Sequence, residues 1–368
     1  MKKIILIATL FFLSLFLPLA VSADEPQNNS FRAEVLKVLE ERLIDREDGS
    51  QAIQQNLLLL GLEGDYQNKE IVSNGIGDFD LVSVGDYKAG DKVYVDRIGD
   101  SGNEESFFVT DYVRTGQLGW LLAIFLIAII VVGGFKGFRS LVSLILSFAV
   151  IFAVIIPLIL KGFDPVLVAA FGVFLVLMAI IYITEGLNKK SHLAVVSVFL
   201  SLLVTLLLAW MFVLWSRLSG FASEEATLLI GTVAGSINFQ GLLLAGILIG
   251  SLGVLDDIVV GQIEAVAQIR EANPNLSKSK IFFSAYKVGN THLGAIVNTL
   301  FLTYAGVSLP LLVMFHLGSG QGLDFWQIIN NDAIATEIVR TLVGAIGLII
   351  SMPLATYLAS RFLNNKNI

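Results

Sequence analysis

Long apolar runs alternate with short polar connectors along most of the chain after residue 116. Each run is long enough to cross about 30 Å of hydrocarbon as a helix. The runs lie near 117–135, 138–160, 165–184, 191–215, 238–257, 292–316 and 338–360. The pattern therefore predicts an α-helical polytopic membrane protein with about seven transmembrane helices.

The connectors between these runs carry their charges unevenly. In the predicted topology, the connectors on one side of the membrane contain ten basic residues. The connectors on the other side contain only Lys161 and Arg217, together with several acids. Because connectors rich in Lys and Arg stay in the cytoplasm, we expect this side and the C-terminus to be cytoplasmic, in a multi-pass protein of the plasma membrane. The ten residues are Lys136, Arg139, Lys189, Lys190, Arg270, Lys278, Lys280, Lys287, Arg361 and Lys366.

The N-terminus has the form of a secretory signal. Lys2 and Lys3 precede an apolar run over 4–21, and small residues follow at 22–23. This pattern predicts a signal peptide over 1–23 that is cleaved from the mature protein. The alternative is an uncleaved anchor, which would make eight spans. Residues 24–116 are extracytoplasmic in both cases.

Residues 24–116 alternate between apolar and polar positions, for example over 31–35 and 92–96, and Gly and Asp occupy the turns between such runs. Alternation of this kind is typical of half-buried strands. Five or six short strands favour a small β-barrel-like domain or a sandwich, in a form that resembles an OB-fold. Residues 35–42 would also suit a helix. The transmembrane domain then covers 117–368.

Composition excludes several classes of function. The chain has no cysteine, so disulfides, thiolate metal sites and cysteine nucleophiles are absent. Residues 24–116 hold 20 acidic and 9 basic side chains, which argues against nucleic acid as a partner. No phosphate-binding glycine loop is present, and no cofactor is expected. The expected partners are the lipid bilayer, a cation or proton, and a protein that binds the outer domain.

Three acids follow one another closely at the cytoplasmic end of the fifth span. Asp256 and Asp257 are adjacent, and Glu264 lies on roughly the same helical face. Carboxylates at a hydrocarbon edge are costly unless they are paired, protonated or bound to a cation. They form a candidate site for a cation or proton, and the sequence does not identify a metal. The alternative is a helix end whose acids face water.

The sixth span supplies possible partners for these acids. Asn290, His292, Asn298 and Thr299 lie in its cytoplasmic half, and Glu185 ends the third span at the same level. Because lipid offers no hydrogen bonds, we expect these polar groups to meet another helix or to line a wet cavity. Together with the aspartates they predict a polar site at the cytoplasmic ends of the fifth and sixth spans.

The connectors around this site also have recognisable patterns. Residues 258–273 predict an amphipathic helix, and the basic segment 277–287 predicts a helix along the inner membrane surface. Pro310 should kink the sixth span. Glu337 and Arg340 are three residues apart and should pair at the outer boundary of the last span.

Several of these segments carry a resemblance to a known family. The matching segments are 253–257, 264–274, 288–292, 298–300, 304–306 and 308–310. Through them the chain resembles the YibE/F-like family of bacterial multi-span membrane proteins. The resemblance implies an outer β-rich part followed by a multi-span domain. It nominates Asp256, Asp257, His292 and Asn298, and it implies no mechanism.

Three functions are consistent with these features to different degrees. An ion- or proton-coupled transporter, or a channel-like protein, accounts for ionisable residues at the ends of spans. A non-enzymatic adaptor or sensor would instead use the outer domain to bind a partner. An intramembrane aspartyl protease would need two facing carboxylates, and adjacent residues on a helix point about 100° apart. We therefore expect a protein that is not an enzyme.

Overall fold

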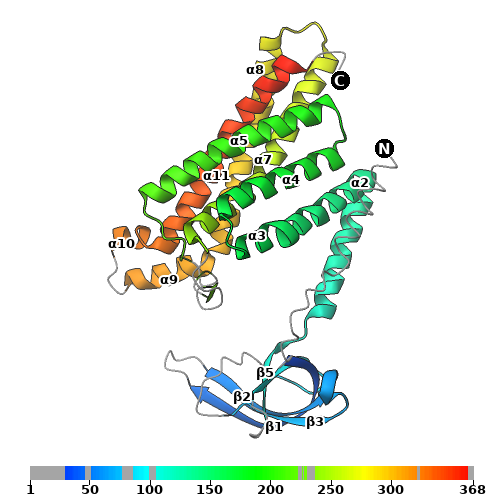
Figure 1. The fold of residues 1–368 in the computed structure, drawn as a ribbon, viewed down its shortest axis with the longest axis vertical. Coiled ribbons are helices and arrows are strands. Elements are labelled where there is room, and N and C mark those ends of the chain that lie inside the picture. The colour runs from blue at the N-terminus through cyan, green and yellow to red at the C-terminus, as the bar shows by residue number, and fades with distance from the viewer. Residues whose placement is uncertain are drawn as a thin grey trace. The chain divides into compact units, whose positions relative to one another are not determined.

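The computed structural model describes residues 30–45, 51–76, 86–98, 105–222, 226, 228–229, 237–320 and 324–363 (Figure 1). The predicted signal peptide lies outside these residues. The chain divides into two compact units, Met1–Ala128 and Ile129–Ile368. Each unit is therefore described by itself.

The first unit contains a five-stranded antiparallel sheet with the strand order β3-β2-β1-β4-β5. Its elements are β1 (Ser30–Asp45), β2 (Gln51–Gly61), the short 3-10 helix η1 (Gly64–Tyr66), β3 (Glu70–Asn74), β4 (Lys92–Ile98) and β5 (Ser106–Tyr112). The edge strands β3 and β5 also contact each other, so the sheet curls (Figure 1).

Apolar and polar residues alternate along the strands, so the apolar side chains point to one face of the sheet and form its core. Ala33 and Val35 of β1 and Val93 and Val95 of β4 are fully buried or nearly so, and polar residues separate them. The sequence prediction of a β-rich segment is confirmed. Residues 35–42 form strand and not helix, because this part of β1 pairs with β2. Backbone pairing with a neighbouring strand overrides their helix-compatible composition.

An ion pair joins the start of β1 to the segment that precedes η1. The Arg32 guanidinium donates to Glu63 with Nη2···Oε2 at 2.6 Å and Nε···Oε2 at 2.8 Å. The Arg32 backbone N–H donates to the other carboxylate oxygen at 2.9 Å. Hydrogen bonds from Arg32 hold the pKa of Glu63 below its ordinary value of 4.5. The charged form of Glu63 is therefore favoured by folding.

This lowered pKa predicts a small pH-dependent contribution to the stability of the sheet. The contribution is present above about pH 4.5 and is lost as the pH falls through the lowered pKa of the folded state. Because the pair is solvent-exposed, Glu63→Gln should destabilise the sheet by at most about 1 kcal/mol. Hydrogen–deuterium exchange of β1 peptides in the full-length protein should show faster exchange in the variant at about pH 7, and a difference that shrinks as the pH falls below about 4.5. A difference that does not change with pH, or that also appears in the control Glu70→Gln, would contradict this origin.

The second unit is helical, and its first helix begins in the first unit. Its elements are α2 (Thr115–Val150), the π-helix η2 (Ile151–Ile155), α3 (Ile156–Leu160), α4 (Pro165–Thr184), α5 (Lys189–Trp215), α7 (Phe239–Ala272), α8 (Lys278–Val307), α9 (Leu309–Gly320), α10 (Phe325–Ile329) and α11 (Asp332–Phe362). Among the described residues, five helical segments are long and apolar enough to cross a membrane, or six if α8 and α9 form one bent span. These helices indicate a multi-pass membrane protein.

One of these segments, Thr115–Leu160, is interrupted by a sharp turn at Gly134. Gly134 has φ 53° and ψ −133°, a combination that is essentially restricted to glycine. A Cβ on Gly137 would lie 2.1 Å from the Ile129 carbonyl oxygen. Residues eight apart in a continuous helix are separated by about 12 Å, so the chain folds back here. The turn coincides with the predicted boundary between the first two apolar runs.

Helix α7 lies at the centre of the helical unit and contacts α4, α5, α8 and α11. Two glycines allow neighbouring helices to come close. Gly289 of α8 lies against Gln262 of α7, and Gly347 of α11 lies against Thr205 of α5. Small residues at such crossings are typical of helix packing in membranes.

Two predicted connectors are continuous with the helices beside them. The helix predicted over 258–273 is confirmed as the second half of α7, which ends at Ala272 with Asn273 as its C-cap. Helix α8 begins at Lys278, after the N-cap Ser277, so the basic segment 277–287 is its first part. The chain has no proline between Asp257 and Pro274, so the helix continues from the fifth span up to that proline.

The sixth predicted span, 292–316, therefore has different bounds. Helix α8 ends at Val307, and α9 continues at an angle of 64°. The predicted kink at Pro310 is confirmed in position, because the break falls at Ser308 between the two helices. Proline has no N–H to continue a helical ladder, which explains the break.

Candidate functional site

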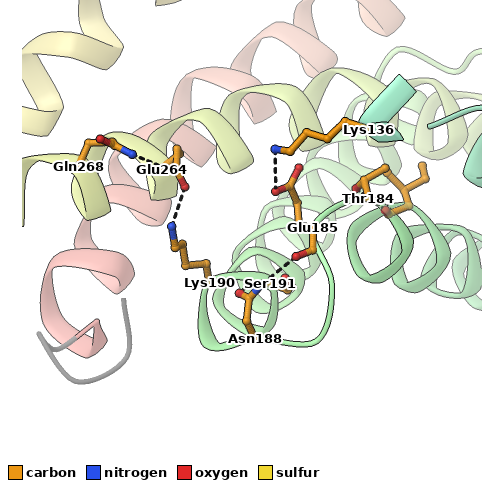
Figure 2. Close-up of polar contacts among 9 residues, drawn as sticks. Lys136, Thr184, Glu185, Asn188, Lys190, Ser191, Glu264 and Gln268 are labelled. Carbon is orange, nitrogen blue, oxygen red and sulfur yellow. Dashed lines mark hydrogen bonds and ion pairs between the residues drawn. The ribbon is translucent and has the colours of Figure 1, made fainter. Parts of the chain in front are cut away.

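A group of four charged side chains lies where α4, α5, α7 and the start of the second unit meet. We call Lys136, Glu185, Lys190 and Glu264 the ion-pair cluster. Lys190 Nζ lies 3.0 Å from Glu264 Oε2, and Lys136 Nζ lies 3.6 Å from Glu185 Oε2. Figure 2 shows each lysine pointing toward its acid. Gln268 donates to the other Glu264 oxygen at 2.8 Å, so both oxygens of this carboxylate are engaged.

The short connector between α4 and α5 positions two members of the cluster. Gly186 has a positive φ of 81°, which lets the chain turn directly after Glu185. Asn188 then caps α5 by accepting from the Ser191 N–H at 2.9 Å, and its amide donates to the Glu185 carbonyl at 2.8 Å. This local network holds Glu185 and Lys190 toward α7 (Figure 2).

A cavity of about 500 Å³ lies against these ion pairs. All four residues of the ion-pair cluster line it, and Gly261 of α7 lines it as well. A Cβ on Gly261 would meet no atom within 4 Å. The cavity is polar and large enough for several waters or a hydrated ion.

Asp256 lies two helical turns before Glu264 on α7 and is half-buried. One of its carboxylate oxygens, Oδ1, is buried and has no hydrogen-bond partner among the described residues. Its carboxylate experiences repulsion from Asp257 and from Glu185. A buried oxygen without a donor is unfavourable, so Asp256 is suited to take up a proton or a cation.

The structure brings together part of the site that the sequence predicts. Asp257 and Glu185 lie close enough to Asp256 for their charges to repel its carboxylate. Glu264 instead pairs with Lys190. Within the described part of the chain, no group of three or more His, Asp or Glu residues is arranged to hold a metal ion.

The predicted contribution of the sixth span is not seen. Asn290, His292, Asn298 and Thr299 all lie on exposed positions of α8. The Thr299 hydroxyl donates to the Ala295 carbonyl at 2.9 Å, so it is satisfied within its own helix. In the described part of the chain, these side chains form no hydrogen bond or ion pair with the aspartates. The buried face of α8 is the one with Ala285, Gly289 and Leu300.

Sequence reasoning counted Lys136 and Lys190 only as topology signals. Their pairing with acids was missed, because Lys190 and Glu264 are 74 residues apart. The sequence did contain a signal for this pairing, because the lysines and glutamates lie at the same predicted depth in the membrane on neighbouring spans. Opposite charges at one level of a membrane bundle are expected to pair.

The Lys190–Glu264 pair predicts compensation between two charge reversals. Lys190→Glu places two carboxylates together and should lower the stability of the protein. Reversal of both charges in Lys190→Glu/Glu264→Lys should restore most of the loss, with a coupling of about 0.2–1 kcal/mol for a partly exposed pair. Thermal unfolding of the four proteins in detergent measures the cycle. A double variant whose loss equals the sum of the single losses would show that the pair does not contribute.

Comparison with known proteins gives one match. The family model described as YibE/F-like protein matches residues 121–365, which covers most of the helical unit and none of the sheet. No curated protein and no solved structure matches the chain.

Proposed function

The chain belongs to the YibE/F-like family, and we propose that it is a transporter or channel-like protein that moves protons or cations across the bacterial plasma membrane. The proposal includes no catalytic reaction and no cofactor. The observation that carries it is Asp256, whose buried Oδ1, in an apolar helix, has no hydrogen-bond partner among the residues that the structure describes. Ionisable residues in membrane helices most often mark ion or proton pathways.

The proposed topology has seven spans. The turn at Gly134 divides the first segment into two crossings, and α4, α5, α7, α8 with α9, and α11 supply five more. The distribution of basic residues supports a cytoplasmic C-terminus and an extracytoplasmic sheet. The sheet's order, with β3 against β5, supports a small barrel of the OB type.

In this topology the ion-pair cluster forms the cytoplasmic entrance. Lys190 and Lys136 neutralise Glu264 and Glu185 at the cavity wall. Asp256 is then the acid whose buried oxygen still needs a counterion or a proton. The cavity is lined by Glu185 and by residues of α7 from Val260 to Glu264, and the proposed path continues from there along α7 to Asp256.

A second candidate function is that of a membrane adaptor or sensor whose outer sheet binds a protein partner. The supporting observation is a set of three exposed leucines along β1. Leu36, Leu39 and Leu43 are 37%, 48% and 60% exposed. Contiguous exposed apolar patches mark sites of protein interaction, and this candidate function takes the three leucines as such a patch.

Solid-supported-membrane electrophysiology on reconstituted protein tests transport directly. Steps of pH, Na⁺ and K⁺ should each be applied, with protein-free liposomes as the control. A current that appears with only one of these ions identifies what is moved. Absence of any current from well-folded protein under every gradient would refute ion transport and would favour the adaptor.

A further inference from the structure

A second cavity lies at the other end of the helical unit, beside the break between α8 and α9. Its volume is about 760 Å³, within the range of small-molecule sites. Apolar side chains from α7, α8 and α9 form much of its wall, including Leu242, Val307 and Met314. Ser308 and Pro310, at the break itself, also line it.

The polar side chains of α11 that line this cavity come from a single stretch of the helix. They are the uncharged Thr336 and the charged Glu337 and Arg340. Arg340 Nη1 lies 2.8 Å from Glu337 Oε1, so the expected pair is present. The sequence reading placed this pair at a boundary, and the structure places it in a cavity wall.

Two donors in this wall are buried without partners. Thr336 is only 4% exposed, and its Oγ1 has no hydrogen-bond partner in the described part of the chain. Arg340 Nε is likewise buried and unpartnered there. Other buried threonines of this unit, such as Thr205 and Thr356, donate to the carbonyl four residues earlier. Thr336 does not, which leaves its hydroxyl for another acceptor.

The geometry of Arg340 indicates which group would satisfy these donors. Nε lies on the side edge of the guanidinium, and this edge forms two-point contacts with carboxylate or phosphate oxygens. Thr336 is four residues before Arg340, so the two donors share one face of α11. An oxyanion placed between them would accept from both.

The charges of the wall indicate the rest of the ligand. Arg340 and Glu337 together have no net charge, so a simple anion would bring an uncompensated charge into an apolar cavity, which is costly. A ligand with an ammonium group as well as an oxyanion would place the ammonium near Glu337 and the oxyanion near Arg340. Its apolar body would pack against the leucine, valine and methionine side chains.

We propose that this cavity binds a zwitterion with an apolar body, through Arg340 and Thr336 for its oxyanion and Glu337 for its ammonium group. Two sources have this chemistry, a free α-amino acid with an apolar side chain and the headgroup of phosphatidylethanolamine. The inference does not require ion transport through Asp256, because binding can be measured without a gradient.

The test uses full-length protein and matched probes. Isothermal titration calorimetry in detergent compares L-leucine with 4-methylpentanoate, which lacks the ammonium group, and with 3-methylbutylamine, which lacks the carboxylate. Native mass spectrometry compares retention of phosphatidylethanolamine with that of phosphatidylglycerol. Binding of leucine alone among the three solutes supports the site with a free ligand. Selective retention of phosphatidylethanolamine without leucine binding supports it with a lipid.

The variant Thr336→Val removes one hydroxyl and preserves the shape of the side chain. It should weaken the observed binding about tenfold, since one hydrogen bond to a charged group is lost. Thr356→Val, on the same helix and outside the cavity, is the control and should bind as the wild type. Equal binding of 4-methylpentanoate and leucine, failure to bind either zwitterion, or unchanged binding by Thr336→Val would overturn the proposal.

Discussion

Replacement of Asp256 by asparagine is expected to reduce the transport current by roughly a hundredfold or more, the scale on which positioned proton-transfer groups act. The amide has nearly the same size as the carboxylate, so the helix packing around residue 256 should persist. It carries no charge and cannot take up a proton at neutral pH. The variant therefore removes the chemistry of the site and little of its structure. The current of reconstituted protein under the gradient that drives the wild type is the measurement.

The adjacent Asp257→Asn provides the matched control. Asp257 has the same chemistry and is exposed, whereas Asp256 is half-buried with an unpartnered oxygen. Loss of charge at Asp257 should change the current less, because its side chain is the more exposed of the two. If both variants lose current equally, the total negative charge at this end of α7 affects the current, and Asp256 has no special role in it. A wild-type current in Asp256→Asn would remove Asp256 from the pathway.

Substitution of Gly347 by alanine is expected to destabilise the helical unit. A Cβ at this position would lie 2.1 Å from Thr205 Oγ1 and 3.2 Å from Thr205 Cβ. Thr205 is fully buried and its hydroxyl donates to the Ser201 carbonyl at 2.9 Å, so it has little freedom to move. Overpacking of this kind costs about 1–3 kcal/mol, more than the gain of about 1 kcal/mol when alanine replaces glycine in a helix.

Gly344→Ala is the control on the same helix. Its nearest contacts would be Leu300 Cδ2 and Ser251 Oγ, both at 3.8 Å, which is ordinary van der Waals distance. This variant should gain the helix-propensity term without the clash and unfold at the same or a higher temperature. Thermal unfolding in detergent should therefore separate the two variants by several degrees. Equal midpoints would show that α5 and α11 are not packed as closely as described.

The apolar helices were the most predictable part of this protein. Hydropathy alone located α4, α5 and α11 within a few residues, because a run of about twenty apolar side chains has few alternatives to a buried or membrane-spanning helix. Helix ends were less predictable. The helix predicted over 258–273 is present and ends at its predicted stop, and it forms the second half of α7. The start of α11, six residues before the predicted 338, was missed.

The candidate site was predicted only in part, and the reason is geometric. Periodicity tells which residues of α8 share a face, and it does not tell which neighbour that face meets. His292 and Asn298 were therefore assigned to the aspartates and lie on exposed positions. Glu185 was placed correctly, because the short connector after α4 leaves it little freedom.

Arg270 illustrates a second limit of sequence reasoning. It was counted among the basic residues that face the cytoplasm, and its side chain is buried. Its guanidinium donates to the Ser360 carbonyl at 3.1 Å, near the end of α11. Carbonyls in the last turn of a helix lack intrahelical partners and attract cations. Arg270 therefore joins α7 to the end of α11 in addition to any role in topology.

The turn at Gly134 has a consequence for the assembly of the whole chain. Without it, Thr115–Leu160 would be one 46-residue helix, about 69 Å long and more than twice the hydrocarbon thickness. In the proposed seven-span topology, a single crossing in place of two would change the number of crossings from odd to even. Each later connector would then emerge on the opposite face of the bilayer, against the preference of its lysines and arginines. In that topology, one backbone conformation that only glycine readily adopts determines on which side of the membrane every later connector lies.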